Sequence, residues 1–313
     1  MVYRPTPTRT GDLVVSDEDV SIHWDYFGEG EREVMVFMNG LGMLTESWYT
    51  SVPRVHPEFD VLLFDYLGQG KSSRVDRPYS IPKLCEYLAR IMDSIGIDRV
   101  HTQGVSYGGF IAADFGRLYQ DRLHTQTISG ILLTRELTFQ MYQDLSLRFY
   151  AGDASHFDLY TRYLYEKIFS EKFLRVIFPK LEKMRLKFYE NYKDDVRCLA
   201  RLTEAQDPFF DGLEDNEAGY RAVRTPTLIL AGEYDRAIPL WMQEKLADIY
   251  PNNKMMVFPA CGHLTYFEEP DLFWENMKAL ARAKSVHYGL DVSAGAVTIP
   301  DATTSGHREV SVS

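Results

Sequence analysis

The stretch "VHTQGVSYGGFIAAD", from Val100 to Asp114, decides how this chain is expected to fold. An apolar run ends at Gly104 and a helical pattern begins after Gly108, with Ser106 between them. Glycines on both sides of a serine allow two backbones to approach closely, as a very tight turn from a strand into a helix requires. The pattern therefore predicts a serine held on such a turn, the geometry called a nucleophile elbow.

The segments on either side of this turn predict a parallel sheet. Short apolar runs bounded by turn residues indicate strands, and the helical stretch at 81–97 between two of them has β-α-β spacing. Strands that alternate with helices indicate an α/β fold with a mostly parallel sheet and helices on both faces. The expected strands lie at 33–42, 59–70, 99–106, 124–133, 225–235 and 253–263, and a last helix is expected at 270–283.

Between residues 134 and 219 the pattern changes to helices without strands. Apolar residues recur there at three- and four-residue spacing, and Pro179 is expected to break the helical run. We interpret 134–219 as a helical cap inserted between two parts of the core, 1–133 and 220–284. Residues 285–313 have no helical period and many small residues, so a loosely ordered tail is expected.

Two further polar residues stand at the ends of expected strands. Asp235 ends the run "TPTLILAGEYD", and His263 ends "NKMMVFPACGH". The carboxyl ends of parallel strands share one edge of a sheet, which is where such sheets place their sites. In the chain order Ser106, Asp235, His263, a base could take the serine proton while a carboxylate orients the base. Two alternatives stay open, since Asp235 could cap the helix that begins in "IPLWMQEKLADIY" and His263 could be a surface loop residue.

A serine nucleophile also needs hydrogen-bond donors for the oxyanion that forms during attack. The backbone N–H of Tyr107 is one candidate, because it lies at the N-terminus of the expected helix, where the helix dipole favours negative charge. The N–H of Leu41, in the glycine loop "MNGLGM", is the second. A plain turn is the alternative interpretation of that loop.

Together these features resemble the alpha/beta-hydrolase family. The resemblance extends from Asp19 to Ala283 and rests on "NGLG", "DYLGQGKSS", "GVSYGG", "GEYDRAIP" and "CGHLTYFEEP". It implies the following roles: nucleophile Ser106, acid Asp235, base His263, and oxyanion donors Leu41 and Tyr107. Asn39 departs from the family pattern, because many relatives carry a histidine there, and the hydrogen bonding behind the loop is therefore open. Serine instead of aspartate at the nucleophile position disfavours the dehalogenase and epoxide-hydrolase branches.

The composition limits the expected partners. The 313 residues are 45% hydrophobic, enough for a sizeable core, and carry a formal net charge of -11, which disfavours a nucleic-acid backbone or an anionic membrane surface. No targeting or membrane-spanning run stands out, and the spacing of Cys85, Cys198 and Cys261 suits neither a zinc site nor a disulfide framework. We expect a cytoplasmic protein that acts on a small molecule without a cofactor or metal, and its oligomeric state stays open.

Aromatic residues in the 134–219 block indicate the kind of substrate. Phe139, Tyr142 and Phe149 are expected to roof the space above Ser106, and such a roof favours a substrate with an apolar acyl or ring portion. The leading hypothesis is hydrolysis of a carboxylic ester or lactone through an acyl-enzyme on Ser106, in chemistry that does not depend on side chains of the cap.

Three other functions stay open. An acyltransferase would pass the same acyl group to an alcohol or a hydroxy acid. A related hydrolase would cleave a carbon–carbon bond in a dienoic diketone. A ligand-binding signalling module would retain only slow hydrolase activity.

Overall fold

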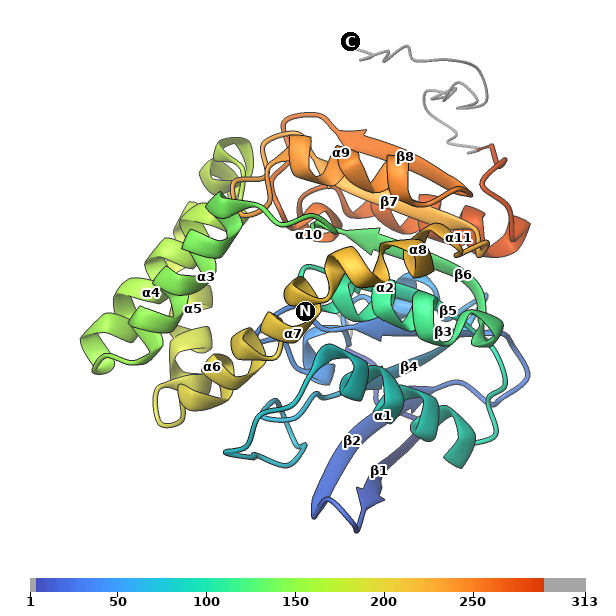
Figure 1. The fold of residues 1–313 in the computed structure, drawn as a ribbon, viewed down its shortest axis with the longest axis horizontal. Helices are drawn as coiled ribbons and strands as arrows, with labels where there is room; N and C mark the ends of the chain where they lie inside the picture. The colour runs from blue at the N-terminus through green and yellow to red at the C-terminus, as the bar shows by residue number, and fades with distance from the viewer. Residues whose placement is uncertain (1–3, 290–313) are drawn as a thin grey trace.

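The computed structural model describes residues 4–289 and builds them around one eight-stranded sheet. The strand order is β1-β2-β4-β3-β5-β6-β7-β8, and the six strands from β4 to β8 in that order are parallel (Figure 1). The predicted α/β fold with a mostly parallel sheet is therefore confirmed. The strands are β1 Arg9–Val15, β2 Val20–Phe27, β3 Val34–Met38, β4 Asp60–Phe64, β5 Val100–Val105, β6 Leu123–Ser129, β7 Thr227–Gly232 and β8 Asn253–Phe258.

The sequence analysis did not predict the antiparallel hairpin of β1 and β2. Its strand β2 pairs with β4 and extends the sheet at one edge. Polar residues interrupt these strands, so they lack the continuous apolar run that marks the others. Two of those polar residues, His23 and Asp25, are buried, and they bond to each other at 3.2 Å between Nε2 and Oδ1. Because these two polar side chains are hydrogen-bonded to each other, they can be buried in β2. The strand therefore lacks the apolar run by which a buried strand is recognised in a sequence.

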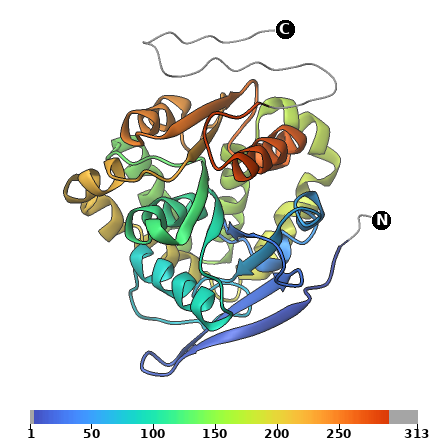
Figure 2. The same cartoon turned by 90° about the vertical axis from the view of Figure 1, so that its right-hand side faces the viewer.

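The sheet separates two hydrophobic clusters. Along β3, Val34, Val36 and Met38 enter one cluster, while Met35 and Phe37 enter the other. Successive side chains of a strand point to opposite faces, so a strand that is buried on both faces must be apolar throughout. The first cluster includes side chains of α1, α2 and α9, and the second includes those of α11, so helices cover both faces, as predicted (Figures 1 and 2).

Six helices lie between β6 and β7, and no strand interrupts them within the described part of the chain. In Figure 1, α3 to α6 lie beyond one end of the sheet, and α7 and α8 lead back toward α2. The expected break at Pro179 is wrong, because α5 continues through it; good helix formers on both sides outweigh the hydrogen bond that proline removes. The helices are α1 Ile81–Ser94, α2 Tyr107–Leu118, α3 Leu137–Tyr150, α4 Ala154–Ile168, α5 Glu171–Tyr192, α6 Arg197–Glu204, α7 Asp207–Asp211, α8 Leu213–Arg221, α9 Leu240–Ile249, α10 Thr265–Glu268 and α11 Pro270–Ala283.

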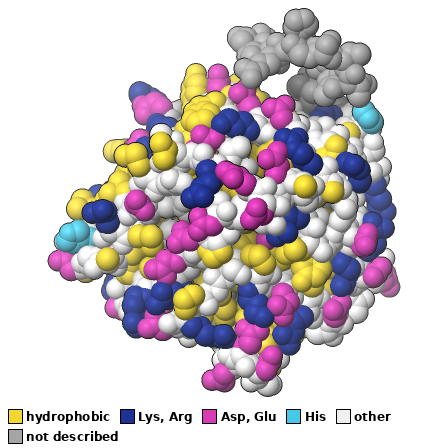
Figure 3. Space-filling model, in the orientation of Figure 1, with side chains coloured by type: hydrophobic (Ala, Val, Ile, Leu, Met, Phe, Trp, Pro, Cys, Tyr) yellow, Lys and Arg dark blue, Asp and Glu magenta, His cyan; other side chains and the backbone are white. Residues whose placement is uncertain are grey.

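The end of the described chain packs against the core. Tyr288 donates a hydrogen bond to Asn276 Oδ1 at 3.1 Å, and its ring lies under the Lys254 ammonium. The rest of the expected tail, 290–313, lies outside the described residues. Within residues 4–289, no helix is long and apolar enough to cross a membrane. Basic and acidic side chains are interspersed over the face shown in Figure 3.

The turn between β5 and α2 depends on backbone contact. A Cβ on Gly104 would lie 2.3 Å from the carbonyl oxygen of Gly108, and a Cβ on Gly108 would lie 2.3 Å from the carbonyl oxygen of Met38. Backbone atoms cannot move aside as the end of a flexible side chain can. Both positions therefore require glycine.

We predict that Gly108→Ala lowers the free energy of unfolding by at least about 1 to 3 kcal/mol, the usual cost of overpacking. Urea unfolding measures the change. Gly289→Ala is the control, since a Cβ there meets no atom within 4 Å. Equal unfolding midpoints for the two variants would contradict the backbone contact.

Candidate active site

Ser106 occupies the tight turn between β5 and α2. Its backbone has φ +53° and ψ -122°, a combination that non-glycine residues rarely adopt. The Ser106 N–H donates to the carbonyl oxygen of Ser129 at the end of β6, at 2.8 Å, which ties the turn to the neighbouring strand. The side chain reaches a cavity beyond the end of the sheet instead of packing into the core. This is the geometry predicted for the elbow.

His263 and Asp235 meet at the carboxyl ends of β8 and β7. The Nδ1 atom of His263 lies 2.7 Å from Oδ2 of Asp235, and both side chains are buried. A carboxylate only accepts hydrogen bonds, so the proton on this side of the ring is on Nδ1 and Nε2 is the nitrogen left to act as a base. The structure thus brings together the two residues that the sequence could only place on separate strand ends.

The carboxylate of Asp235 accepts four hydrogen bonds. Oδ1 accepts from the N–H groups of Ala237 and Ile238, and Oδ2 accepts from Gln243 Nε2 as well as from His263. Asp235 does not cap α9, whose N-cap is Pro239, but it does close the turn that leads into that helix. Holding a turn and orienting a histidine are therefore done by the same carboxylate.

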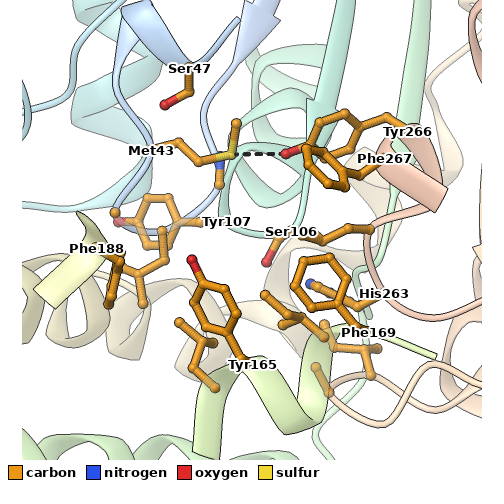
Figure 4. Close-up of a pocket in the computed structure, with 18 of the residues that line it drawn as sticks. Met43, Ser47, Ser106, Tyr107, Tyr165, Phe169, Phe188, His263, Tyr266 and Phe267 are labelled. Atoms are coloured by element: carbon orange, nitrogen blue, oxygen red, sulfur yellow. Dashed lines mark hydrogen bonds between the residues drawn. The ribbon is translucent and has the colours of Figure 1, made fainter. Parts of the chain in front are cut away.

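Ser106 and His263 line one cavity with Leu41 and Tyr107. Figure 4 shows the Ser106 hydroxyl and the His263 ring facing this shared space. Within residues 4–289, the N–H groups of Leu41 and Tyr107 have no hydrogen-bond partner in the protein. Unpaired N–H groups beside a serine hydroxyl are what a developing oxyanion requires.

The loop that carries Leu41 is fixed from both of its ends. Met43 N–H donates to Gly40 O at 3.0 Å, and Gly40 N–H points at the Met43 sulfur at 3.3 Å. Behind it, Asn39 donates to the Phe64 carbonyl at 3.1 Å and accepts from the indole N–H of Trp48 at 2.8 Å. The Asn39 amide therefore makes hydrogen bonds to two buried groups behind the loop. The sequence alone had left this hydrogen bonding open.

The cavity has a volume of about 600 Å³, and residues between β6 and β7 form one wall of it. Phe139 and Tyr142 line it, as expected, but Phe149 does not. The Phe149 ring instead packs against Tyr160 and Tyr163, with centroids 6.0 Å from each. Phe149 lies two helical turns beyond Tyr142, so it shares the face of the helix but not the depth of the cavity.

Other aromatic side chains close the space around His263. Tyr165, Phe169, Tyr266 and Phe267 surround it in Figure 4 and line the cavity. Burial raises the pKa of the Tyr165 hydroxyl to about 12, so this group stays a neutral donor. Tyr165, Tyr266 and Phe267 lie in helices and Phe169 directly follows one, and their apolar pattern did not show which side faces a cavity.

The segment between α4 and α5 braces both strand-end loops, a feature that the sequence did not reveal. The Ile168 carbonyl accepts from the N–H groups of His263 and Leu264, at 2.9 and 3.4 Å. Arg236, next to Asp235, donates to the Phe169 carbonyl at 2.9 Å. Every residue has a backbone carbonyl, so these contacts could not be predicted from a sequence pattern.

The buried Cys261 thiol lies two residues before His263. Burial raises the pKa of the Cys261 thiol well above its usual range, so the sulfur stays protonated and a poor nucleophile. Among residues 4–289, no three histidine, cysteine, aspartate or glutamate side chains are grouped so that they could hold a metal ion.

Comparison with known proteins identifies the family. The family described as the alpha/beta hydrolase fold matches residues 33–270, most of the chain. This chain belongs to that family, which is one of hydrolases.

Individual relatives are distant. The chain is 24% identical over 246 residues to a Pseudomonas savastanoi pv. phaseolicola protein provisionally named carbamate hydrolase RutD, covering 77% of this chain and 90% of that protein. It is 26% identical over 269 residues to 2-hydroxy-6-oxononadienedioate/2-hydroxy-6-oxononatrienedioate hydrolase 1 of Pseudomonas putida, covering 82% and 90%. Among solved structures, the alpha/beta hydrolase MGS-M2 from a Medee basin deep-sea metagenome library superimposes with a TM-score of 0.77 at 22% identity, covering 88% and 96%. The fold is shared, whereas the named reactions differ among the relatives.

Gln243 is a buried residue that the sequence analysis missed. Its side chain donates to Asp235 Oδ2 and to the Ile238 carbonyl, and accepts from the Gly130 N–H at 3.2 Å. It therefore links the loops that follow β6 and β7.

We predict that Gln243→Met, which keeps the volume but removes the donor to Asp235 Oδ2, slows the reaction of Ser106 with a fluorophosphonate about tenfold or more, since a hydrogen bond to a charged group contributes about 1.5 to 3 kcal/mol. The rate of covalent labelling measures the effect, with the urea midpoint as a check on folding. An unchanged labelling rate would show that Gln243 does not position Asp235.

Proposed function

We propose that this chain is a serine hydrolase that cleaves a carboxylic ester or lactone with an apolar acyl or ring portion. Ser106 attacks the carbonyl carbon while His263 takes its proton, and the N–H groups of Leu41 and Tyr107 stabilise the oxyanion. Collapse of the tetrahedral intermediate expels the alcohol, which receives the proton from His263. A water molecule, activated by the same histidine, then releases the acid and regenerates Ser106.

One observation carries this proposal. A serine on a strained turn shares a cavity with a histidine whose Nδ1 is bonded to a buried carboxylate, with two unpaired N–H groups beside it. Strain of this kind persists only where the surrounding structure enforces it, and it is found most often at functional sites. A serine with a purely structural role would not need the histidine, the buried carboxylate or the unpaired N–H groups.

The cavity favours an ester over the substrates named for the relatives. A carbamate of a few atoms would leave most of a volume of about 600 Å³ unfilled. The Pseudomonas putida relative is named for a dioate, which carries two carboxylates. Of the two basic side chains that line this cavity, Arg54 is paired with Asp271 and Lys187 is exposed. Cleavage of a carbon–carbon bond is the second candidate, favoured by that relative's name, and a dienoic diketone assay separates it from ester hydrolysis.

An acyltransferase would form the same acyl-enzyme. The difference lies in the second step, in which an alcohol or a hydroxy acid replaces water as the acceptor. Product analysis in the presence of added alcohol distinguishes the two, because hydrolysis yields only the free acid.

Fluorophosphonate labelling with site mapping tests the nucleophile. We expect wild-type protein to be labelled at Ser106, and Ser106→Ala to remain folded but unlabelled, because the hydroxyl is needed for attack and contributes little to packing. Labelling that persists in the variant would refute the assignment.

The cavity wall is expected to select the substrate. We predict that Phe139→Ala and Tyr142→Ala lower kcat/KM more for long-chain or ring-bearing esters than for acetate esters, by about 1 to 3 kcal/mol, the range for apolar pocket contacts. Phe149→Ala is the matched control, since its ring packs outside the cavity. Equal losses on short and long esters in both cavity variants would place the selecting surface elsewhere.

A further inference from the structure

A cluster of uncharged polar side chains lines the same cavity as Ser106, far from it in sequence. Helix α3 contributes Gln143 and Ser146, α4 contributes Tyr160, α6 contributes Thr203, and Gln206 follows α6. Their exposed fractions lie between 0% for Tyr160 and 9% for Gln143. We call these five residues the cap polar site. Buried polar groups require partners, so the hydrogen bonds that they leave unmade indicate what the cavity accepts.

The two side-chain amides of this site are hydrogen-bonded to each other. Each keeps one further group, a donor on one and an acceptor on the other, that is not used in this bond. Gln143 Nε2 donates to Gln206 Oε1 at 3.0 Å. Within the described chain, the Gln143 carbonyl oxygen and the Gln206 amino group have no hydrogen-bond partner. Exchanging oxygen and nitrogen in both amides gives the same result, one free acceptor and one free donor. A ligand group that both donates and accepts would satisfy the pair.

The hydroxyl groups of the site complete this pattern. Ser146 donates to the Tyr142 carbonyl at 2.9 Å and Thr203 donates to the Leu199 carbonyl at 3.0 Å, so both present only acceptor lone pairs. The Tyr160 hydroxyl is buried and makes no hydrogen bond of normal geometry, and the hydroxyls of Tyr150 and Ser146 lie close enough to interact with it. Burial raises the pKa of Tyr160 well above its usual range, so it remains a donor at neutral pH.

No charge is available at this site. All five side chains are neutral, and Phe110, Phe139 and Leu164, which line the same cavity, are apolar. A carboxylate placed here would lose its hydration without gaining a counter-charge, which costs several kcal/mol. A neutral group with one hydrogen and one or two lone pairs fits instead.

We propose that the cap polar site binds a hydroxyl group on the acyl portion of the substrate, so that the natural substrate is an ester or lactone of a hydroxy acid. This proposal deepens the proposed function, on which it rests for the position of the ester at Ser106. The hydroxyl accepts from the free amide N–H or the Tyr160 hydroxyl and donates to the free amide oxygen. The apolar walls take the chain between the hydroxyl and the ester.

Binding to the Ser106→Ala variant tests the site without requiring turnover. The probes are methyl octanoate, a series of methyl hydroxyoctanoates in which the hydroxyl moves along the chain, and the half methyl ester of a dicarboxylic acid of the same length, studied by calorimetry. We expect at least one hydroxy ester to bind about tenfold or more tightly than methyl octanoate, since an unmet buried hydrogen bond costs about 1 to 3 kcal/mol. The carboxylate probe should bind more weakly than methyl octanoate. Equal binding of every hydroxy ester and methyl octanoate, or tightest binding of the carboxylate, overturns the proposal.

A double variant in the Ser106→Ala background locates the effect. Adding Gln143→Met and Gln206→Met removes both amides at nearly constant volume, and should abolish the preference for the hydroxy ester while methyl octanoate still binds. Gln140→Met is the matched control on α3, outside the cavity lining. A preference that survives the double variant refutes the role of the amides, and so does an equal loss for both probes.

The two proposals fail in different ways. If wild-type protein is not labelled by a fluorophosphonate yet the hydroxyl preference is measured, the serine chemistry is wrong and the binding site stands. If labelling occurs without any preference for a hydroxyl, the chemistry stands and the cap polar site does not recognise substrate.

Discussion

The carbonyl oxygen of Met38 lies only 2.3 Å from the position that a Cβ on Gly108 would occupy, so the end of β3 and the first turn of α2 are in direct backbone contact. This contact presses α2 against the end of the sheet and leaves Ser106 only a strained turn between β5 and the helix. The loop that begins after Met38 carries Leu41, which lines the same cavity as Tyr107. The proposed nucleophile and the two proposed oxyanion donors are therefore set by one close approach of two backbones.

The second constraint is a buried carboxylate. Asp235 can be buried only because every donor that it needs is supplied, two from its own turn and two from His263 and Gln243. Gln243 in turn accepts from the Gly130 N–H, so hydrogen bonds through Gln243 and Asp235 join the loops after β6, β7 and β8. The same network determines which nitrogen of His263 is free.

The sequence predicts what depends on local pattern. The apolar strands, the glycines around Ser106 and the positions of Asp235 and His263 at strand ends are all local, and the structure confirms the fold that they imply. The hairpin of β1 and β2 escaped detection because buried polar residues interrupt its strands. Helical periodicity shows which residues share a face of α3, but it does not show how far along the helix the cavity extends. The prediction that Phe149 lines the cavity was therefore wrong. Gln143 and Gln206 are 63 residues apart, and no local signal pairs them.

The helices between β6 and β7, the predicted cap, are joined to the proposed catalytic loops through backbone carbonyls. The Ile168 carbonyl holds the N–H of His263, and Arg236 beside Asp235 reaches the carbonyl of Phe169. Glu268 accepts from the N–H of Ser170 at 2.8 Å, which fastens the same segment at the start of α5. A cap that swung away as a rigid body would withdraw these carbonyls from both loops and leave buried donors unpaired. Any movement of these helices that preserves the hydrogen bonds must leave 166–170 in place, because this short segment holds both loops.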